Sequence, residues 1–219
     1  MKRMRNMSTS EAQALFLALS KGKLLAPALE WLAQSGYTFS EKELAGRKLV
    51  LTAQEGGLHA ILVRADDVPI YVEYGVADLG VVGKDTLLES EAEVFEPLDL
   101  GFGQCRLVVA GKPEDEKEDL RQRSLVRVGT KYPKIARWHF DRIGVQAEII
   151  ALKGSVELSV LAGLAEVVVD IVETGATLRE NGLVVYHEIL SSSARLIVNK
   201  ASHKLKSAAI DALLRSTCG

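Results

Sequence analysis

The sequence predicts an α/β protein made of two similar lobes, each built on a mainly parallel sheet. One reason is that short apolar segments alternate with segments of helical periodicity along the chain. Another is an internal repeat, because VPIYVEYGVADLGVVG at 68–83 aligns without a gap with VELSVLAGLAEVVVDI at 156–171. Two lobes joined by crossing strands are expected to leave a cleft in which a ligand binds.

The first half of the chain supplies most of the first lobe. Residues 1–13 are basic and polar, so we expect a flexible N-terminal arm. A strand at 15–19 is followed by a turn and then by a helix, whose apolar residues recur at helical spacing as far as Gly36. Further strands are expected at 48–52, 60–63 and 79–82, with a helix at 68–74.

The second half repeats this order. The strand, turn and helix expected over 125–144 match those over 15–36, and Arg106–Val109 matches Arg195–Val198. The regions 98–110 and 186–198 are the expected crossing strands, and 204–217 is an expected amphipathic helix. The domain prediction is therefore the arm at 1–13, lobe I at 14–103 with 185–219, and lobe II at 104–184.

Composition argues against several classes of protein. The 219 residues are 47% hydrophobic and carry a net charge of -2, which predicts a globular core and neither a nucleic-acid nor a membrane partner. No stretch has the length and hydrophobicity of a transmembrane helix or a signal peptide. Cys105 and Cys218 lie far apart, which fits a reducing cytoplasm. The four histidines have no ligand spacing, so no metal site of the protein's own is predicted.

The stretch EVVVDIVETGATLRENG at 166–182 carries the clearest site pattern. A buried strand is followed by two acids and then by a glycine turn that opens a helix. Unpaired N–H groups and the helix dipole favour an anion there, and glycine lets the backbone approach it closely. The acids could hold ribose hydroxyls or magnesium. The predicted phosphate cradle is Thr174, Gly175, Ala176, Thr177 and Leu178, and Asp170 and Glu173 are the two acids that precede it; the alternative is a strand–turn–helix with threonine caps.

This stretch resembles the ATP phosphoribosyltransferase family. The family pattern is a glutamate, a glycine six residues later, an apolar strand ending in aspartate, and a threonine-glycine-x-threonine-leucine turn. Further resemblance lies in ALSKGKL, ILVRADDVPIYVEYGVADLGVVGKD, LDLGFGQCRLVVA and ARLIVNKAS, so it spans 16–202. The matching residues of the main pattern are Glu157, Gly163, Val168, Asp170, Thr174, Gly175, Thr177 and Leu178.

The resemblance implies a fold, a reaction and partners. The fold would be similar to type II periplasmic binding proteins. The reaction would join N1 of the adenine of ATP to C1 of phosphoribosyl pyrophosphate, releasing pyrophosphate, as the first step of histidine biosynthesis. Mg²⁺ would accompany the pyrophosphate. The chain length matches the family's short form, which implies a separate regulatory subunit resembling histidyl-tRNA synthetase in a hetero-oligomer.

A second set of candidate residues lies in the first half. Ser20-Lys21-Gly22-Lys23 is a basic glycine turn at a helix start, and Arg47 precedes the next strand. The resemblance implies that this turn and Arg47 contact phosphates and the leaving pyrophosphate, with Arg47, Lys23 and Lys21 catalytic and Ser20 and Gly22 near ATP. The family commonly has arginine in place of Lys23. From the residues alone, these cations could equally be solvated surface charges.

The repeat of the cradle in the first half is Gly80–Lys84, which lacks the threonine turn. The resemblance implies that the adenine and ribose of ATP lie near Asp78, Leu79 and Gly80. The alternative for the glycines is close packing of a strand on a helix. Two other functions share the overall pattern: a type I phosphoribosyltransferase acting on another base, and a non-catalytic two-lobed small-molecule binding protein.

Overall fold

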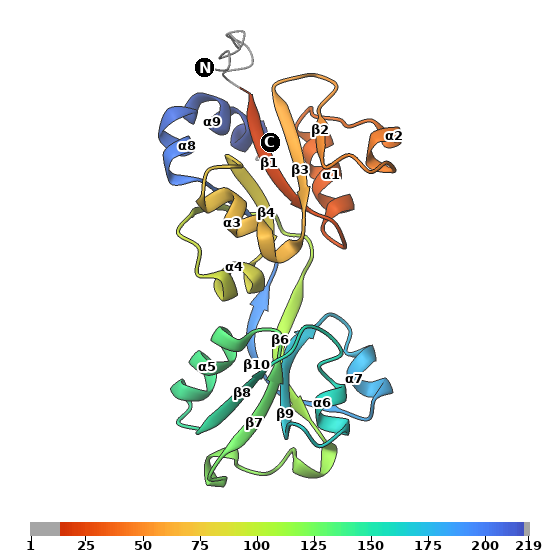
Figure 1. The fold of residues 1–219 in the computed structure, drawn as a ribbon, viewed down its shortest axis with the longest axis vertical. Coiled ribbons are helices and arrows are strands. Elements are labelled where there is room, and N and C mark those ends of the chain that lie inside the picture. The colour runs from red at the N-terminus through yellow and green to blue at the C-terminus, as the bar shows by residue number, and fades with distance from the viewer. Residues whose placement is uncertain (1–13, 217–219) are drawn as a thin grey trace, which may run out of the picture. The chain divides into compact units, whose positions relative to one another are not determined.

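The structure is a computed structural model, and it describes residues 14–216 (Figure 1). The expected N-terminal arm at 1–13 lies outside the described residues. The chain forms two compact units: unit 1 contains the residues up to Gly103 and those from Ser193 onward, and unit 2 is Gln104–Ser192. The second boundary lies later than the expected 184/185, because β10 (Val184–Ser192) pairs with β6 (Cys105–Gly111) from end to end.

Unit 1 is built on a six-stranded sheet in the order β2-β3-β1-β4-β11-β5. The central strand β1 is parallel to β3 and to β4, whereas the remaining neighbours are antiparallel. Its strands are β1 (Leu15–Ser20), β2 (Val50–Thr52), β3 (Leu58–Val63), β4 (Leu79–Gly83), β5 (Phe95–Asp99) and β11 (Ala194–Val198). Its helices are α1 (Leu25–Gln34), α2 (Glu41–Leu44), α3 (Val68–Glu73), α4 (Lys84–Ser90), α8 (Lys200–Leu205) and α9 (Ser207–Ser216), with a 3₁₀ turn at Ala65–Asp67.

Helices cover both faces of this sheet. Successive residues of a strand point to opposite faces. Leu17 and Leu19 therefore pack in the cluster that contains Trp31 of α1 and residues of α9, whereas Ala18 packs against Val68 and other residues of α3. Burial on both faces explains why β1 is an uninterrupted apolar run in the sequence.

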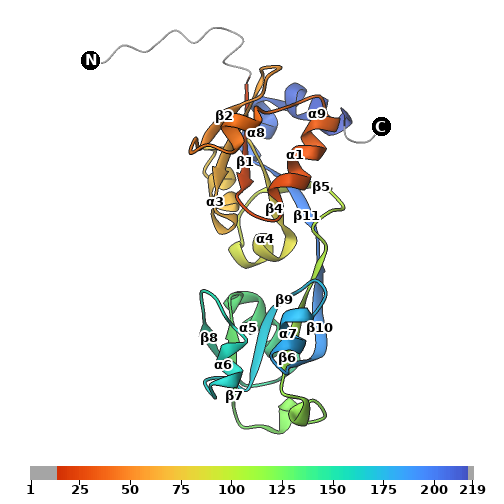
Figure 2. The same ribbon diagram turned by 90° about the vertical axis from the view of Figure 1, so that its right-hand side faces the viewer.

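Unit 2 repeats this three-layer arrangement around a five-stranded sheet in the order β10-β6-β9-β7-β8. The strands β9, β7 and β8 are parallel, and β6 is antiparallel to both of its neighbours. Helix α5 covers one face, and α6 and α7 cover the other (Figure 2). The bounds are β7 (Val126–Thr130), β8 (Ala147–Ala151), β9 (Val167–Val172), α5 (Pro133–Arg142), α6 (Leu158–Leu161) and α7 (Ala176–Glu180), with 3₁₀ turns at Pro113–Asp115 and Leu120–Gln122.

The predicted α/β class and the two similar lobes are confirmed, and both sheets are mixed. The parallel strands form a block in each sheet. The antiparallel pairs come from β5 and β6, which lie consecutively on the first passage between the units, from β10 and β11 on the return, and from the short edge strand β2.

The internal repeat is visible in atomic contacts as well as in sequence. Asp78 immediately precedes β4, and its carboxylate accepts the backbone N–H of Phe16 in β1 at 2.9 Å. Its sequence equivalent, Glu166, immediately precedes β9 and accepts the backbone N–H of Arg127 in β7 at 2.6 Å. In both units, therefore, an acid before one parallel strand fixes the start of its neighbour.

Two of the four histidines have a structural contact in unit 2. His139 of α5 is buried, and its Nε2 lies 2.8 Å from Nε2 of His187 in β10. Burial lowers the pKa of His139 to about 4, with further lowering by the charges of His187 and Arg142, and burial also lowers the pKa of His187. Across residues 14–216, no helix is long and apolar enough to cross a membrane.

Candidate active site

The predicted phosphate cradle lies where β9 leads into α7. Gly175 caps the helix in the left-handed conformation with φ +75, which explains the need for glycine. A Cβ at this position would lie 2.8 Å from Nη1 of Arg179, which donates to the carbonyl of Thr174 at 2.8 Å. This hydrogen bond from Arg179 of α7 closes the turn. Thr174 and Thr177 remain exposed.

Packing of Leu178 in the core holds the cradle in place. Leu178 is only 4% exposed and belongs to the core cluster between the sheet and helices α6 and α7. The backbone N–H of Ala176 is 3.4 Å from Oγ1 of Thr174, a long contact that leaves this donor largely available. The arrangement offers N–H and hydroxyl donors at the carboxyl end of β9, with one apolar side chain as the anchor.

Asp170 lies on β9 ahead of the cradle, and the surroundings of its carboxyl group disfavour the ionised form. Burial raises the pKa of its carboxyl, and the negative charge of Glu157 raises it further. The hydrogen bond from the N–H of Ile171, at 2.8 Å, and the charge of Lys131 oppose this effect without cancelling it. A carboxylate in this position gains from a hydroxyl donor or a cation supplied by a ligand.

Two neighbouring segments bring residues to this edge that the cradle pattern alone does not identify. Lys131 directly follows β7, and the loop after β8 leads to Glu157 at the start of α6. Ser155 in that loop has φ 47, an unusual conformation for a residue other than glycine. The sequence signal for Glu157 is its place in the family pattern, whereas Lys131 requires knowledge of which strands are adjacent.

In unit 1, the basic turn follows β1 at the carboxyl edge of the parallel strands. Ser20 is 5% exposed, whereas Lys21, Gly22 and Lys23 are exposed. The N–H of Lys21 donates to the carbonyl of Val63 at 3.0 Å, and this joins the ends of β1 and β3. Gly22 has φ +143, so the turn uses a conformation that other residues rarely adopt.

A cavity of about 510 Å³ opens beside this turn. Charged side chains of both signs line it, and the size suits a nucleotide-sized ligand. Carboxyl edges of parallel strands are where open α/β sheets bind ligands. Its polar lining comes from Lys21, Arg64, Asp66, Asp67 and Tyr71, of which sequence analysis identified only Lys21 as a site residue.

Arg47 lies in the turn between α2 and β2. It is exposed, and it makes no hydrogen bond or ion pair with any residue from 14 to 216. Its neighbour Lys48 pairs with Glu43, and Leu49 lines the 510 Å³ cavity. Arg47 is therefore an available cation close in sequence to the cavity wall.

The structure does not support direct ATP contacts by Asp78, Leu79 and Gly80. Asp78 is 6% exposed, and it also accepts from Oγ of Ser202 at 2.6 Å and from Nζ of Lys206 at 2.8 Å. Leu79 is fully buried, and a Cβ on Gly80 would lie 2.8 Å from Val68 and Val72 of α3. The alternative of close strand–helix packing describes this glycine.

These three residues also lie at the wrong end of the strand. Ala18 pairs with Gly80 and Leu19 with Val81, so Asp78 precedes β4 near the start of β1, whereas the basic turn follows the end of β1. The two halves of the expected ATP site are therefore separated along the strands. The basic turn and the 510 Å³ cavity share the carboxyl edge instead.

Two repeated α/β units, each with cations and turn backbone at the carboxyl edge of its parallel strands, are typical of a two-lobed protein that binds phosphorylated small molecules. The family model described as HisG, ATP phosphoribosyltransferase, matches residues 64–217. The chain belongs to the ATP phosphoribosyltransferase family, glycosyltransferases of the first step of histidine biosynthesis.

Individual relatives agree over nearly their whole length. The ATP phosphoribosyltransferase of Lachnoclostridium phytofermentans is 52% identical over 192 residues, which is 87% of this chain and 89% of that protein. The enzyme of Syntrophotalea carbinolica is 53% identical over 190 residues, covering 86% and 87%. A solved ATP phosphoribosyl transferase (HisG:HisZ) complex from Thermotoga maritima contains a chain that is 33% identical, with a TM-score of 0.80 and coverage of 93% of this chain and 96% of that one.

Proposed function

We propose that this chain joins N1 of the adenine of ATP to C1 of phosphoribosyl pyrophosphate. The N1 lone pair forms the new bond while the bond from C1 to the pyrophosphate oxygen breaks, and pyrophosphate leaves with that electron pair. No protein nucleophile is needed, so catalysis rests on orientation and on charge stabilisation. The observation that carries the proposal is the Thr174–Leu178 turn, whose threonines are exposed at the carboxyl end of the parallel strands of unit 2, with Asp170 beside it.

In unit 2, the Thr174–Leu178 turn would hold the 5′-phosphate through its N–H groups and hydroxyls. Asp170, with Glu173 and Glu157, would accept hydrogen bonds from the ribose hydroxyls, and these bonds would satisfy a carboxylate whose burial raises its pKa. The ribose would thereby be fixed at the point where positive charge develops on C1.

In unit 1, the cavity beside the basic turn would take ATP. Lys21 and Arg64 supply positive charge in its wall, and Asp66 and Asp67 supply acceptors for hydroxyl or amino groups. Gly22 and Lys23 would contact phosphate, with buried Ser20 shaping the turn from inside. Arg47 would act on the departing pyrophosphate together with Lys21 and Lys23.

Mg²⁺ fits the donor set in unit 2. Magnesium is usually held by one or two carboxylates together with substrate phosphates. Asp170 and Glu173 are such carboxylates, and the negative charge of Glu157 near Asp170 would add to the attraction for a cation. When bound, the ion would neutralise charge on the pyrophosphate group.

We further propose that the chain works with a HisZ-like regulatory subunit. The support is its match over 93% of its length to a chain of the HisG:HisZ complex from Thermotoga maritima. A cytoplasmic location is also proposed, because Cys105 and Cys218 lie far apart and suit a reducing compartment. Turnover of ATP with phosphoribosyl pyrophosphate, measured with and without such a subunit, tests the reaction and the partner together.

Thr177→Val tests the cradle directly. The change keeps the shape of the side chain and removes one exposed hydroxyl. Loss of a hydrogen bond to a charged phosphate is expected to cost about 1.5–3 kcal/mol, or roughly 10- to 150-fold in affinity for phosphoribosyl pyrophosphate. Calorimetric titration measures this, with ATP titration as the internal control. Equal losses for both substrates would mean that the threonine is a structural cap, and no loss would place the phosphate elsewhere.

A further inference from the structure

Lys131 is a cation at the substrate edge of unit 2 that the roles above leave unused. It is the first residue after β7, and Thr130 pairs with Val169 of the parallel strand β9. The next step of this register places Lys131 beside Asp170. Its side chain is exposed and has no hydrogen bond or ion pair within the part of the chain that the structure describes.

The backbone on both sides of Lys131 is firmly held. The fully buried hydroxyl of Thr130 donates to the carbonyl of Val169 at 2.7 Å and accepts the N–H of Tyr132 at 2.8 Å. Tyr132 is itself buried in the core of unit 2, and Pro133 begins α5 immediately afterwards. Lys131 is therefore an exposed residue on a fixed turn, which is how binding side chains are usually positioned.

The positive charge of Lys131 acts on Asp170, the acid proposed to hold the ribose. It opposes the rise in the pKa of Asp170 that burial and Glu157 cause. No ion pair joins Lys131 to Asp170, so its ammonium donors are available to a ligand in contact with Asp170.

The order of groups along the edge indicates which part of the ligand this would be. The threonine turn continues from β9 into α7, on the face that α6 and α7 cover, whereas Lys131 leads into α5, on the opposite face. Asp170 lies on the strand that leads into the threonine turn, and the register of β7 and β9 also places it beside Lys131, so it comes between the turn and the lysine. In phosphoribosyl pyrophosphate, the ribose likewise separates the 5′-phosphate from the pyrophosphate.

We propose that Lys131 is a substrate-binding residue that donates to the pyrophosphate group of phosphoribosyl pyrophosphate. This rests on the proposed function, in which the cradle holds the 5′-phosphate and Asp170 the ribose. Unit 2 would then supply a cation of its own for the leaving group. Pyrophosphate carries several negative charges, and a lysine ammonium binds such a group as a point charge without needing bidentate geometry.

The test is to titrate Lys131→Gln with inorganic pyrophosphate and, separately, with ribose 5-phosphate, both with magnesium present. Affinity for pyrophosphate is expected to fall about 10- to 100-fold, while affinity for ribose 5-phosphate changes less than threefold. Thr177→Val should give the opposite result. Lys131→Arg should restore most of the pyrophosphate affinity, because it keeps the charge.

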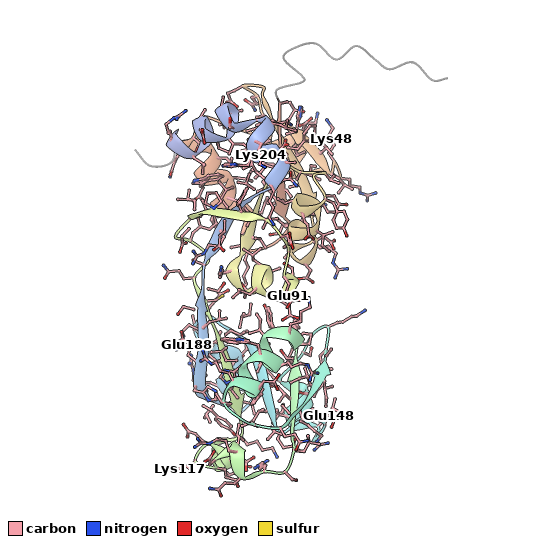
Figure 3. The ribbon with its side chains drawn as sticks, turned by 90° about the vertical axis from the view of Figure 1, so that its left-hand side faces the viewer. Lys48, Glu91, Lys117, Glu148, Glu188 and Lys204 are labelled. Atoms are coloured by element: carbon pink, nitrogen blue, oxygen red, sulfur yellow. The ribbon has the colours of Figure 1, made fainter. Side chains whose placement is uncertain are left out.

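Lys117→Gln is the matched control. Lys117 lies on the loop after β6 (Figure 3). The last residue of β6, Gly111, pairs with Val167 at the start of β9, so this loop is at the opposite end of the strands from Lys131. Unchanged pyrophosphate affinity in Lys131→Gln would overturn the inference. So would an equal loss of ribose 5-phosphate, which would show that Lys131 acts only through Asp170. Failure of the wild-type protein to bind either probe would count instead against the proposed function.

Discussion

Arg47→Ala is expected to lower kcat roughly 30- to 1,000-fold, with a much smaller change in KM for either substrate. This corresponds to the loss of about 2–4 kcal/mol of transition-state stabilisation. The reason is that Arg47 is an exposed cation with no partner within residues 14–216, so its charge is available when pyrophosphate departs. An interaction made mainly in the transition state affects kcat more than binding.

Steady-state kinetics of Arg47→Ala and of Lys48→Ala would measure this. Lys48 is the adjacent cation, but it is paired with Glu43, so its removal should leave kcat unchanged. Arg47→Lys keeps the charge without the planar guanidinium and should retain part of the rate. An unchanged kcat in Arg47→Ala would remove this residue from the site.

The second large effect is expected in stability. Asp78→Ala should lower the free energy of unfolding by about 2–4 kcal/mol, because it leaves the N–H of Phe16 and the hydroxyl of Ser202 without their acceptor and the ammonium of Lys206 without its carboxylate partner. The expected loss is smaller than for a fully buried ion pair, because the Lys206 side chain is 26% exposed. The affinity for ATP of the folded variant should be unchanged.

Denaturant unfolding and calorimetric titration with ATP would separate the two roles of this acid. Asp66→Ala is the matched control, because Asp66 is an exposed acid in the cavity wall and has no hydrogen bond or ion pair of this kind with residues 14–216. It should leave stability unchanged and weaken ATP binding. If Asp78→Ala instead kept full stability and lost ATP affinity, the nucleotide would contact Asp78, as the family resemblance implied.

Local patterns predicted the strand, turn and helix that form the proposed cradle, since these features are contiguous. The acids, the left-handed glycine and the buried leucine all fall within 170–178, so strand, turn and anchor can be identified without knowing the tertiary structure. The repeat was likewise visible, because Asp78 and Glu166 occupy aligned positions. Their shared task, fixing the start of a neighbouring strand, emerges only when β1 and β7 are placed beside β4 and β9.

The features that sequence did not reveal depend on contacts between distant segments. Asp78 is a structural residue because Ser202 and Lys206, more than a hundred positions later, reach its carboxylate. Lys131 is adjacent to Asp170 only through the register of β7 and β9. The cavity residues Arg64 and Asp66 acquire a common role because β1 and β3 end together. No spacing rule within one segment encodes these neighbours.

The position of β11 has a consequence for how the chain folds as it is synthesised. This strand lies between β4 and β5 in the sheet of unit 1, although the whole of unit 2 precedes it in the chain. Unit 2 is continuous and can complete its sheet once Ser192 has emerged from the ribosome. Until residues 194–198 arrive, β4 is paired only with β1 and β5 has no partner strand in the sheet, so the N-terminal half of this protein matures last. Pauses in translation between 104 and 193 would prolong the exposure of those unpaired strand edges, and this is the interval in which the nascent chain most needs chaperone protection.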